Sequence, residues 1–287
     1  MENIQLGIVQ EQLTNSESPN QKTKLNVVIR TCDKASLVSE RIVQKDECVK
    51  RCYKSLLTSL NNYNHPFSLH VIDDDSSVET KQFLHNHFPN ATIHDVVVDP
   101  TIEYKDVKQK SRYSLKIALD YISQLPDDEL VYLVEDDYLH YPNSIAIMID
   151  AMNYLTFISS DTTIGIFPQD FNQLYYHPKN PFNDTYVSTC LVIPGPDRYY
   201  RNTWFTHESF LIPVSLFKKY KEEFYSLLDI GTIDGYWEGN TISNVWQKPE
   251  VKMMMPMKTL AIHLGEPKDI SFYVNDLEEL WEQNRIS

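Results

Sequence analysis

The chain has 287 residues, of which 40 are acidic and 26 are lysine or arginine, so its formal net charge is −14 at pH 7. The length fits one large α/β domain or two small ones, and a hydrophobic share of 42% excludes global disorder. Because phosphate backbones and anionic lipid headgroups are also negative, this charge disfavours general nucleic-acid binding and attachment to an anionic membrane.

The cysteines and the apolar runs bear on the compartment. No second Cys/His pair accompanies the cysteines at the spacing of a zinc site, so we interpret all four as reduced thiols: Cys32, Cys48, Cys52 and Cys190. No apolar run is long enough to span a membrane, and residues 1–23 lack the basic start and apolar stretch of a secretory signal. We therefore expect a cytoplasmic protein with no membrane span, whose residues 1–24 form a flexible lead-in.

Predicted strands and helices alternate through the first half of the chain. Short apolar, β-branched runs predict strands over 25–31, 67–72, 91–98 and 130–134. Apolar residues at helical spacing predict helices over 40–61, 78–87, 111–125 and 145–155. This alternation predicts an α/β fold with a mostly parallel central sheet that helices cover on both faces.

The second half of the chain is less periodic. Residues 167–201 are rich in Pro, Asn, Asp and Tyr, which indicates long loops with short strands. The later pattern predicts a strand running into a helix over 204–217, helix over 218–228, a loop over 231–240, a short helix over 241–246 and one strand over 251–264. Because we find no internal repeat and no clear linker, we interpret residues 25–287 as a single domain.

Two acidic clusters follow predicted strands of the first half. Glu135-Asp136-Asp137 comes directly after the apolar strand over 130–134. In open α/β sheets ligands bind at the carboxyl ends of the strands, and two carboxylates there can hold a hard divalent cation that grips a diphosphate. The alternative is a helix cap or a solvated acidic turn.

The second acidic cluster is Asp73-Asp74-Asp75, after the strand over 67–72. Three adjacent carboxylates repel one another unless a ligand or a cation relieves them, and one of them could accept hydrogen bonds from a base or a ribose. The alternative is a cap for the helix that begins near Val78, a role that Ser76 or Ser77 would fill equally well.

Four further residues have side chains suited to metal binding or proton transfer. His263 ends the late strand, where a neutral imidazole could complete a metal site or be a satisfied core residue. Asp234 and Glu238 lie in a glycine-flanked loop, where a carboxylate could take a proton from an attacking hydroxyl or serve as ordinary turn chemistry. Glu208 is a second candidate base, or else a polar residue at the start of a strand.

From about Leu25 to Gly265 the chain resembles glycosyltransferases of the GT-A fold, near the family-two group that uses nucleotide-diphosphate sugars. Four segments carry the resemblance: Val27–Thr31, Ile72–Ser77, Ser111–Ala118, and Tyr132–Tyr138, which is similar to the Asp-x-Asp motif with Glu135 in place of the first Asp. The resemblance implies a nucleotide-binding half over 25–140 and an acceptor-binding half over 141–287.

The resemblance also implies roles for single residues. Those assigned to nucleotide-sugar binding are Arg30, Thr31, Asp73, Asp74, Asp75, Arg112, Glu135 and Asp136. Asp137 and His263 are assigned to the metal, with Glu135 touching the ribose or the metal. The family's usual Glu-Asp pair before the C-terminal helix has no plain counterpart, and Asp234 and Glu238 are the nearest match to it.

The activity expected from this reading is sugar transfer dependent on Mn²⁺ or Mg²⁺. The donor would be a nucleotide-diphosphate sugar, with a UDP-sugar as the first guess, and the acceptor a hydroxyl of a glycan or another molecule. A base, Asp234, Glu238 or Glu208, would deprotonate the acceptor hydroxyl for a single displacement that inverts the anomeric centre.

Three other interpretations remain open from the sequence. Asp73-Asp74-Asp75-Ser76 fits the opening motif of haloacid dehalogenase-like phosphatases, with Asp73 as nucleophile and Asp75 as acid, although a full βα unit precedes it here. Glu135 in the metal motif and the missing base pair also fit a non-catalytic sugar-binding protein on a degenerate transferase scaffold. A transferase that modifies bases in DNA is disfavoured by the charge.

Overall fold

The computed structural model describes residues 23–34, 45–96, 107–171, 191–229, 241–265, 270–271 and 273–286, with side chains from residue 111 onward in the third range. The first half contains β1 (Leu25–Thr31), α2 (Lys45–Tyr63), β2 (Phe67–Asp73), α3 (Val78–His87), β3 (Thr92–Asp95), α4 (Val107–Ile122), β4 (Leu130–Glu135), β5 (Tyr138–His140), α5 (Ser144–Ser159) and β6 (Thr163–Ile166). The second half contains β7 (Val192–Pro194), β8 (Tyr199–Thr203), β9 (Phe210–Pro213), α8 (Val214–Lys219), α9 (Lys221–Tyr225), a 3₁₀ turn η1 (Ser226–Asp229), α10 (Ser243–Trp246), β10 (Val251–Pro256), β11 (Ala261–His263) and α11 (Leu277–Gln283).

The described strands form one nine-stranded sheet in the order β3-β2-β1-β4-β9-β6-β10-β8-β7 and a small sheet of β5 and β11. In the large sheet β3, β2, β1 and β4 are parallel, and so are β6 and β10, whereas β9 and β8 run antiparallel to their neighbours. The predicted α/β fold with a mostly parallel sheet is therefore confirmed.

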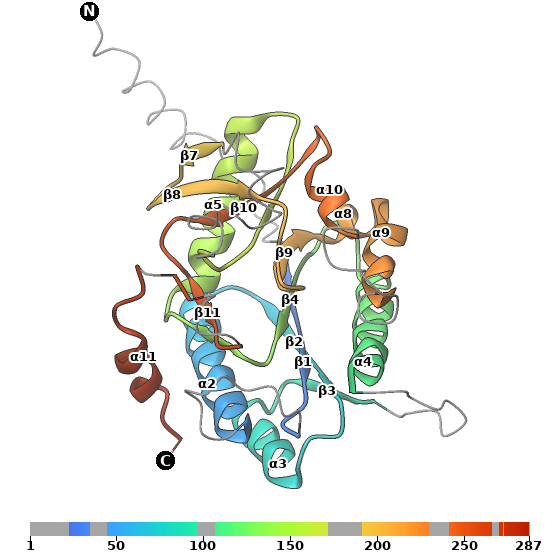
Figure 1. Ribbon diagram of the computed structural model, residues 1–287, viewed down its shortest axis with the longest axis vertical. Coiled ribbons are helices and arrows are strands. Elements are labelled where there is room, and N and C mark those ends of the chain that lie inside the picture. Colours follow the sequence, from blue (N-terminus) through green and yellow to red (C-terminus); the bar gives the residue numbers. More distant parts are fainter. Residues whose placement is uncertain are drawn as a thin grey trace, which may run out of the picture.

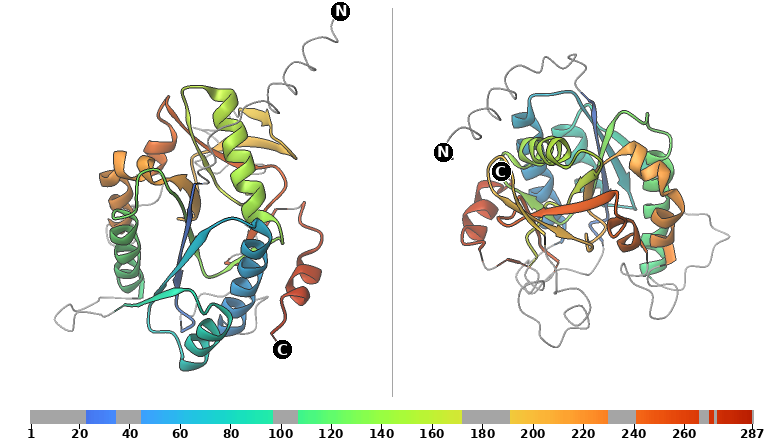
Figure 2. Two further views of the ribbon diagram at one scale, coloured as in Figure 1. Left: turned by 180° about the vertical axis from the view of Figure 1, so that it is seen from behind. Right: turned by 90° about the horizontal axis from the view of Figure 1, so that it is seen from above.

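Helices lie on both sides of this sheet (Figures 1 and 2). α2, α3 and α5 lie on one side, and α4, α8 and α9 on the other. β1, at the centre of the parallel part, is buried along all seven of its residues, which explains why its apolar residues Val27, Val28 and Ile29 follow one another directly and do not alternate with polar ones. The carboxyl ends of β1, β2 and β4 therefore meet at one edge of the sheet.

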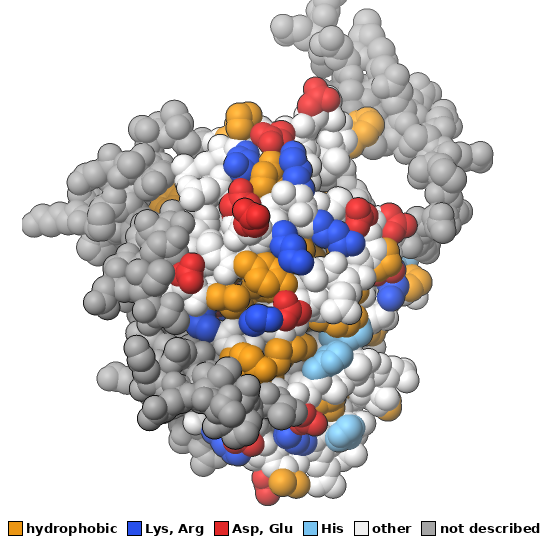
Figure 3. Space-filling model, turned by 90° about the vertical axis from the view of Figure 1, so that its right-hand side faces the viewer, with side chains coloured by type: hydrophobic (Ala, Val, Ile, Leu, Met, Phe, Trp, Pro, Cys, Tyr) orange, Lys and Arg blue, Asp and Glu red, His pale blue; other side chains and the backbone are white. Residues whose placement is uncertain are grey.

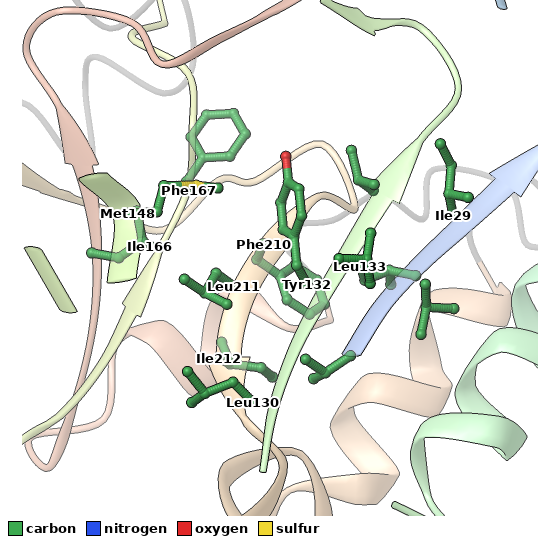
Figure 4. Packing of buried hydrophobic residues seen from close by; sticks show 14 of the residues in the cluster. Ile29, Leu130, Tyr132, Leu133, Met148, Ile166, Phe167, Phe210, Leu211 and Ile212 are labelled. Carbon is green, nitrogen blue, oxygen red and sulfur yellow. The ribbon is translucent and has the colours of Figure 1, made fainter. Parts of the chain in front are cut away.

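The core continues across the antiparallel strand β9, which lies between β4 and β6 (Figure 4). Phe210, Leu211 and Ile212 of β9 are buried with Leu133 of β4 and Phe167, which follows β6. Full burial of such a side chain is worth roughly 1.5–3 kcal/mol, so β9 fixes the two halves of the sheet to each other. The polypeptide just before β9 is consequently held against the end of β4.

Most predicted elements agree with the structure to within a few residues, and the helix over 78–87 agrees at both ends. The single strand predicted over 251–264 is wrong: it consists of β10 and β11, which belong to different sheets. Pro256, which has no N–H to donate, ends β10, and the chain then crosses to pair β11 with the unpredicted β5. The unpredicted β6 is parallel to β10.

The surface carries charges of both signs. On the face shown in Figure 3, lysine and arginine side chains lie among aspartate and glutamate side chains, with apolar groups between them. Of the helices that the structure describes, none is both long and apolar enough to cross a bilayer.

Candidate active site

Three potential metal ligands meet at the carboxyl edge of the sheet. Glu135 ends β4, Asp137 follows two residues later, and His263 ends β11. One ligand atom from each of the three lies within 4.8 Å of the other two. His263 Nε2 is 3.4 Å from Asp137 Oδ2. The structure thus brings together the two residues assigned to the metal and the glutamate that replaces the first Asp of the motif.

The small sheet explains how His263 reaches the end of β4. β11 pairs with β5 so that His263 lies opposite Tyr138, and the Leu264 N–H donates to the Asp137 carbonyl at 2.9 Å. The imidazole stacks on the Tyr138 ring with centroids 5.0 Å apart. Gly265 leaves room for it, because a Cβ there would lie 2.6 Å from His263 Cε1. The imidazole is therefore held on two sides.

The chemistry of this group fits a divalent cation. Asp137 Oδ1 is buried and has no hydrogen-bond partner among the residues that the structure describes. Burial opposes ionisation of Asp137, but His263 and Lys45 together with a backbone hydrogen bond outweigh it and lower the pKa of the carboxyl well below its ordinary value. Carboxylate oxygens with one imidazole nitrogen suit Mn²⁺, and the oxygens alone suit Mg²⁺. The three residues can therefore supply part of a metal's coordination shell.

Asp136, between the two ligand candidates, faces the protein interior. Its Oδ2 accepts hydrogen bonds from Thr31 Oγ1 at 3.0 Å and from the Cys32 N–H at 2.8 Å, and Lys45 Nζ lies 2.7 Å from its Oδ1. These contacts join the ends of β1 and β4 to the start of α2. Thr31 and Asp136, both assigned to nucleotide binding, are thus hydrogen-bonded to each other in this structure.

A chain of ion pairs lies beside the candidate metal site. Arg30 Nη2 is 2.6 Å from Glu135 Oε1 and 3.1 Å from Glu208 Oε2, and Arg112 Nη1 is 2.5 Å from Glu208 Oε1. Arg30 retains only 7% of its side-chain exposure and Glu208 only 12%. Two arginines that are distant in sequence are thereby held next to each other by one carboxylate.

The two glutamates of this chain of ion pairs have opposite pKa shifts. Burial raises the pKa of Glu135 to about 7 against the pull of Arg30, with Asp137 and Glu208 adding to the rise. Burial also acts on Glu208, but Arg112 and then Arg30 outweigh it and lower its pKa. A carboxylate that two guanidinium groups hold in its charged form is a poor proton acceptor. The geometry therefore favours Glu208 as a counter-ion over Glu208 as the base.

The loop that carries Glu208 has an unusual backbone. His207 and Glu208 have φ values of 45° and 57°, in the left-handed region that non-glycine residues rarely adopt. Each such residue costs on the order of 1 kcal/mol, so the surrounding contacts must fix this conformation. The His207 ring packs against Phe205 and Phe171, with centroids 4.4 and 4.6 Å away, and these contacts hold the loop in place.

The second acidic cluster is largely occupied by protein partners. Asp73 has no exposed surface, its Oδ1 accepts from the Ser76 N–H at 3.3 Å, and its Oδ2 lies 2.9 Å from Lys81 Nζ. Asp74 is buried, and its N–H donates to the Thr31 carbonyl at 2.8 Å. Asp75 is exposed and pairs with Lys34 at 3.1 Å.

The helix after this cluster is capped by a serine. Ser77 is the N-cap residue of α3, and its side chain accepts from the Thr80 N–H. A cap for that helix was the alternative to a ligand-binding role, and Ser77 fills it. Asp73 and Asp75 are therefore available for another role only to the extent that Lys81 and Lys34 release them.

Two predicted catalytic residues, Asp234 and Glu238, lie outside the described residues, as does Cys190. Lys45 was missed by the sequence reasoning although it neutralises Asp136 inside the site. Burial opposes its charge, but Asp136 and Asp137 together outweigh burial and raise the pKa of Lys45. A lysine in the first turn of a helix gives no sequence signal for this contact, because the helix dipole favours acidic residues there.

Comparisons with known proteins give structural similarity only. No protein-family model matches the sequence, and no curated protein matches it. Among solved structures, the chain is similar to the galactosyltransferase LgtC in complex with donor and acceptor sugar analogues, with 12% identity and a TM-score of 0.41 over 79% of this chain and 72% of that one. It is also similar to S. aureus TarS, with 13% identity and a TM-score of 0.45 over 82% of this chain and 36% of TarS.

A third similar structure is 4-diphosphocytidyl-2C-methyl-D-erythritol synthase from Anaerococcus prevotii, with 11% identity and a TM-score of 0.42 over 91% of this chain and 95% of that one. Glycosyltransferases, the class that the sequence resembles, are thus among the structural neighbours. At these identities and TM-scores the similarity extends no further than the α/β architecture, and conclusions about function rest on the side chains of this chain.

Proposed function

We propose that this protein is a metal-dependent glycosyltransferase that moves a sugar from a nucleotide-diphosphate donor, a UDP-sugar in the first instance, to a hydroxyl of a glycan or another acceptor. The observation that carries the proposal is the meeting of Glu135, Asp137 and His263 within 4.8 Å at the carboxyl edge of the sheet. Ligands of open α/β sheets bind at that edge. Asp137 and His263 would hold Mn²⁺ or Mg²⁺ together with Glu135.

A metal held there would supply electrostatic stabilisation of the diphosphate that leaves. The protein's own contribution comes from the adjacent arginines. Arg30 lies against Glu135, and Arg112 is joined to it through Glu208. Their guanidinium groups are fixed before the donor arrives, so they can meet the charge that develops on the leaving group without reorganising. This pre-organisation is the role we assign to Glu208.

The proposal divides the chain into a nucleotide-binding half over 25–140 and an acceptor-binding half over 141–287. Glu135 and Asp137 come from the first half, and His263 comes from the second, so the candidate metal site joins the two. The base is proposed to be Asp234 or Glu238, with inversion at the anomeric carbon. Cys48 and Cys52 are buried free thiols, in keeping with the cytoplasmic location that we propose.

The experiment that tests the proposal is thermal unfolding with a panel of nucleoside diphosphates, each with and without Mn²⁺. A ligand present at one hundred times its Kd stabilises the native state by about 2.7 kcal/mol, a rise of roughly 5–10 °C for a chain of this size. We expect one diphosphate to give this rise only with Mn²⁺, and Asp137→Asn to abolish it. Asp127→Asn, which removes an exposed carboxylate paired with Lys218 ahead of β4, is the matched control and should retain the rise.

Two outcomes would contradict the proposal. The first is that no diphosphate stabilises the protein with Mn²⁺ while Mg²⁺ with inorganic phosphate does, together with hydrolysis of para-nitrophenyl phosphate. That result would favour the phosphatase, although Asp73, its nucleophile, is fully buried and paired with Lys81. The second is metal-dependent nucleotide binding with no release of nucleoside diphosphate from any UDP-sugar, GDP-sugar or CDP-sugar, even when simple sugars are offered as acceptors. That result would favour the non-catalytic sugar-binding protein.

A further inference from the structure

A cavity of about 250 Å³ lies at the opposite end of the parallel strands from the candidate active site. Its lining includes residues from the end of α2, from the first two-thirds of α5 and from the start of β4. The helices α2 and α5 pack against each other (Figure 1). Leu130 lines the cavity and begins β4, whereas Glu135 ends the same strand. Five residue steps of a strand span about 17 Å, so a ligand in this cavity would not touch the candidate metal site.

The cavity has an apolar floor and a polar rim. Leu130 and Ile149 are each 7% exposed and form part of the floor. Tyr63 and His65 form a wall, with ring centroids 4.8 Å apart and the rings at 73° to each other. Asp150 is exposed and lies at the rim. A surface of this kind suits a ligand that has both an apolar face and a polar edge.

The polar groups of the rim come from one helix face and one turn. Asp150 and Asn153 are three residues apart on α5, so their side chains lie on the same side of the helix. Asn64, with φ of 52°, ends α2 in the left-handed conformation usual after a helix, and the chain then turns to place His65 beside Tyr63. His65 Nδ1 is buried and has no hydrogen-bond partner among the described residues.

The donors and acceptors of this rim match neighbouring hydroxyl groups. A carboxylate accepts hydrogen bonds, a primary amide donates and accepts them, and a neutral imidazole donates at one nitrogen and accepts at the other. Each hydroxyl group of a ligand can both donate and accept a hydrogen bond. The Asp150 carboxylate at the rim disfavours anionic ligands. An ammonium ligand fits this rim less well than a hydroxyl, because an ammonium group only donates hydrogen bonds and the amide and imidazole beside the single carboxylate also present donors. A cavity of about 150 Å³ holds benzene, so this larger one has room for a six-membered ring with substituents.

We propose that this cavity is a non-catalytic binding site for one neutral pyranose unit, with its C–H face on Leu130, Ile149 and the Tyr63 ring and its hydroxyl groups on His65, Asp150 and Asn153. The proposal does not depend on the transferase activity. A protein that acts on glycans through the other edge of the sheet would gain from it a second point of attachment to the same chain of sugars.

The test is saturation-transfer NMR on the full chain with methyl glycosides of glucose, galactose, mannose and N-acetylglucosamine at millimolar concentration. We expect at least one to bind, and Asp150→Ala and Asn153→Ala each to raise its Kd by about tenfold, the loss of one good hydrogen-bonded contact. Both positions are exposed on a helix, where alanine is well tolerated. Thr156→Ala, on the same helix outside the cavity lining, and Asp137→Asn, at the candidate metal site, should leave the Kd unchanged.

Three outcomes would overturn the proposal. One is that none of the four glycosides binds. A second is that binding is lost in Asp137→Asn but retained in Asp150→Ala and Asn153→Ala, which would place the sugar at the other edge of the sheet. A third is that choline, used as an ammonium probe, binds in a manner that depends on Asp150 while the glycosides do not. None of these outcomes bears on the thermal-unfolding test with nucleoside diphosphates, so the two proposals fail separately.

Discussion

Removal of Glu208 distinguishes a counter-ion from a catalytic base. In Glu208→Ala, Arg112 loses its partner at 2.5 Å, and Arg30 keeps only Glu135. Breaking a buried ion pair by removing one partner costs roughly 3–5 kcal/mol. The three side chains retain between 7% and 18% of their exposure, so we take the lower end, about 3 kcal/mol. For a chain of this size that corresponds to a fall in melting temperature of roughly 6–12 °C.

The assay combines thermal unfolding with steady-state kinetics on Glu208→Gln, which keeps the shape of the side chain and removes its charge. If Glu208 is a counter-ion, its replacement should lower the melting temperature and raise the KM for the donor. The effect on kcat should be smaller, and the pH profile of kcat should not change. A base would behave in the opposite way, since general-base catalysis is worth about 10²–10⁴ in rate. A loss of kcat in that range, with the melting temperature and the donor KM unchanged, would refute the counter-ion role.

The matched control for this prediction is Asp75→Asn. It also removes a carboxylate from an ion pair at the same edge of the sheet, but Asp75 and Lys34 keep 65% and 54% of their side-chain exposure. Exposed pairs contribute about 0–1 kcal/mol, so the melting temperature should change by a few degrees at most. A fall as large as that of Glu208→Ala would show that the loss is not specific to the buried arginines.

Three further predictions concern the surroundings of the site. Burial lowers the pKa of His140 to about 4, so below pH 6.5 the unfolded chain binds a proton that the folded protein does not bind. The free energy of unfolding should therefore fall by about 2 kcal/mol from pH 7 to pH 5. Urea unfolding of His140→Gln should show a correspondingly smaller fall. Gly265→Ala should weaken Mn²⁺ binding by about tenfold in calorimetry because the new Cβ displaces His263, whereas Gly195→Ala, whose Cβ meets Tyr200 instead, should not. Lys45→Met should lower the free energy of unfolding by about 3 kcal/mol, because it leaves the Asp136 carboxylate buried without its cation. In chemical unfolding, the double variant Lys45→Met/Asp136→Asn should lose less free energy than the sum of the two single losses.

The elements that sequence reasoning placed best are those whose signal is local. β1 and β4 each contain an uninterrupted apolar stretch because both of their faces are covered, and α3 begins at a serine cap that the sequence indicates. The acidic residues at the carboxyl ends of β2 and β4 follow directly from these strands. Their position at the edge of the sheet needs no knowledge of distant contacts.

The parts that the sequence could not provide depend on pairings between distant segments. β5 and β11 are three residues each, too short for a periodic pattern, yet their pairing brings His263 to Asp137 across 126 positions of sequence. His207 and Glu208, the two residues with left-handed backbone before β9, are not glycines, so the sequence does not indicate their conformation. This conformation directs Glu208 toward the arginines. Lys45 likewise gains its role only because the start of α2 lies beside Asp136, which follows β4.

The charges at the carboxyl edge show how an acidic protein can receive an anionic donor. Asp136 is neutralised by Lys45, and Asp73 lies beside Lys81, so these two carboxylates add little repulsion. Around the candidate metal site, the carboxyl groups of Glu135, Asp137 and Glu208 lie with the guanidinium groups of Arg30 and Arg112 and the imidazole of His263. A divalent cation bound by Glu135 and Asp137 would add two positive charges to this group. A diphosphate would therefore be attracted more strongly to the edge with metal than without it, which is the physical reason to expect nucleotide binding to depend on the cation.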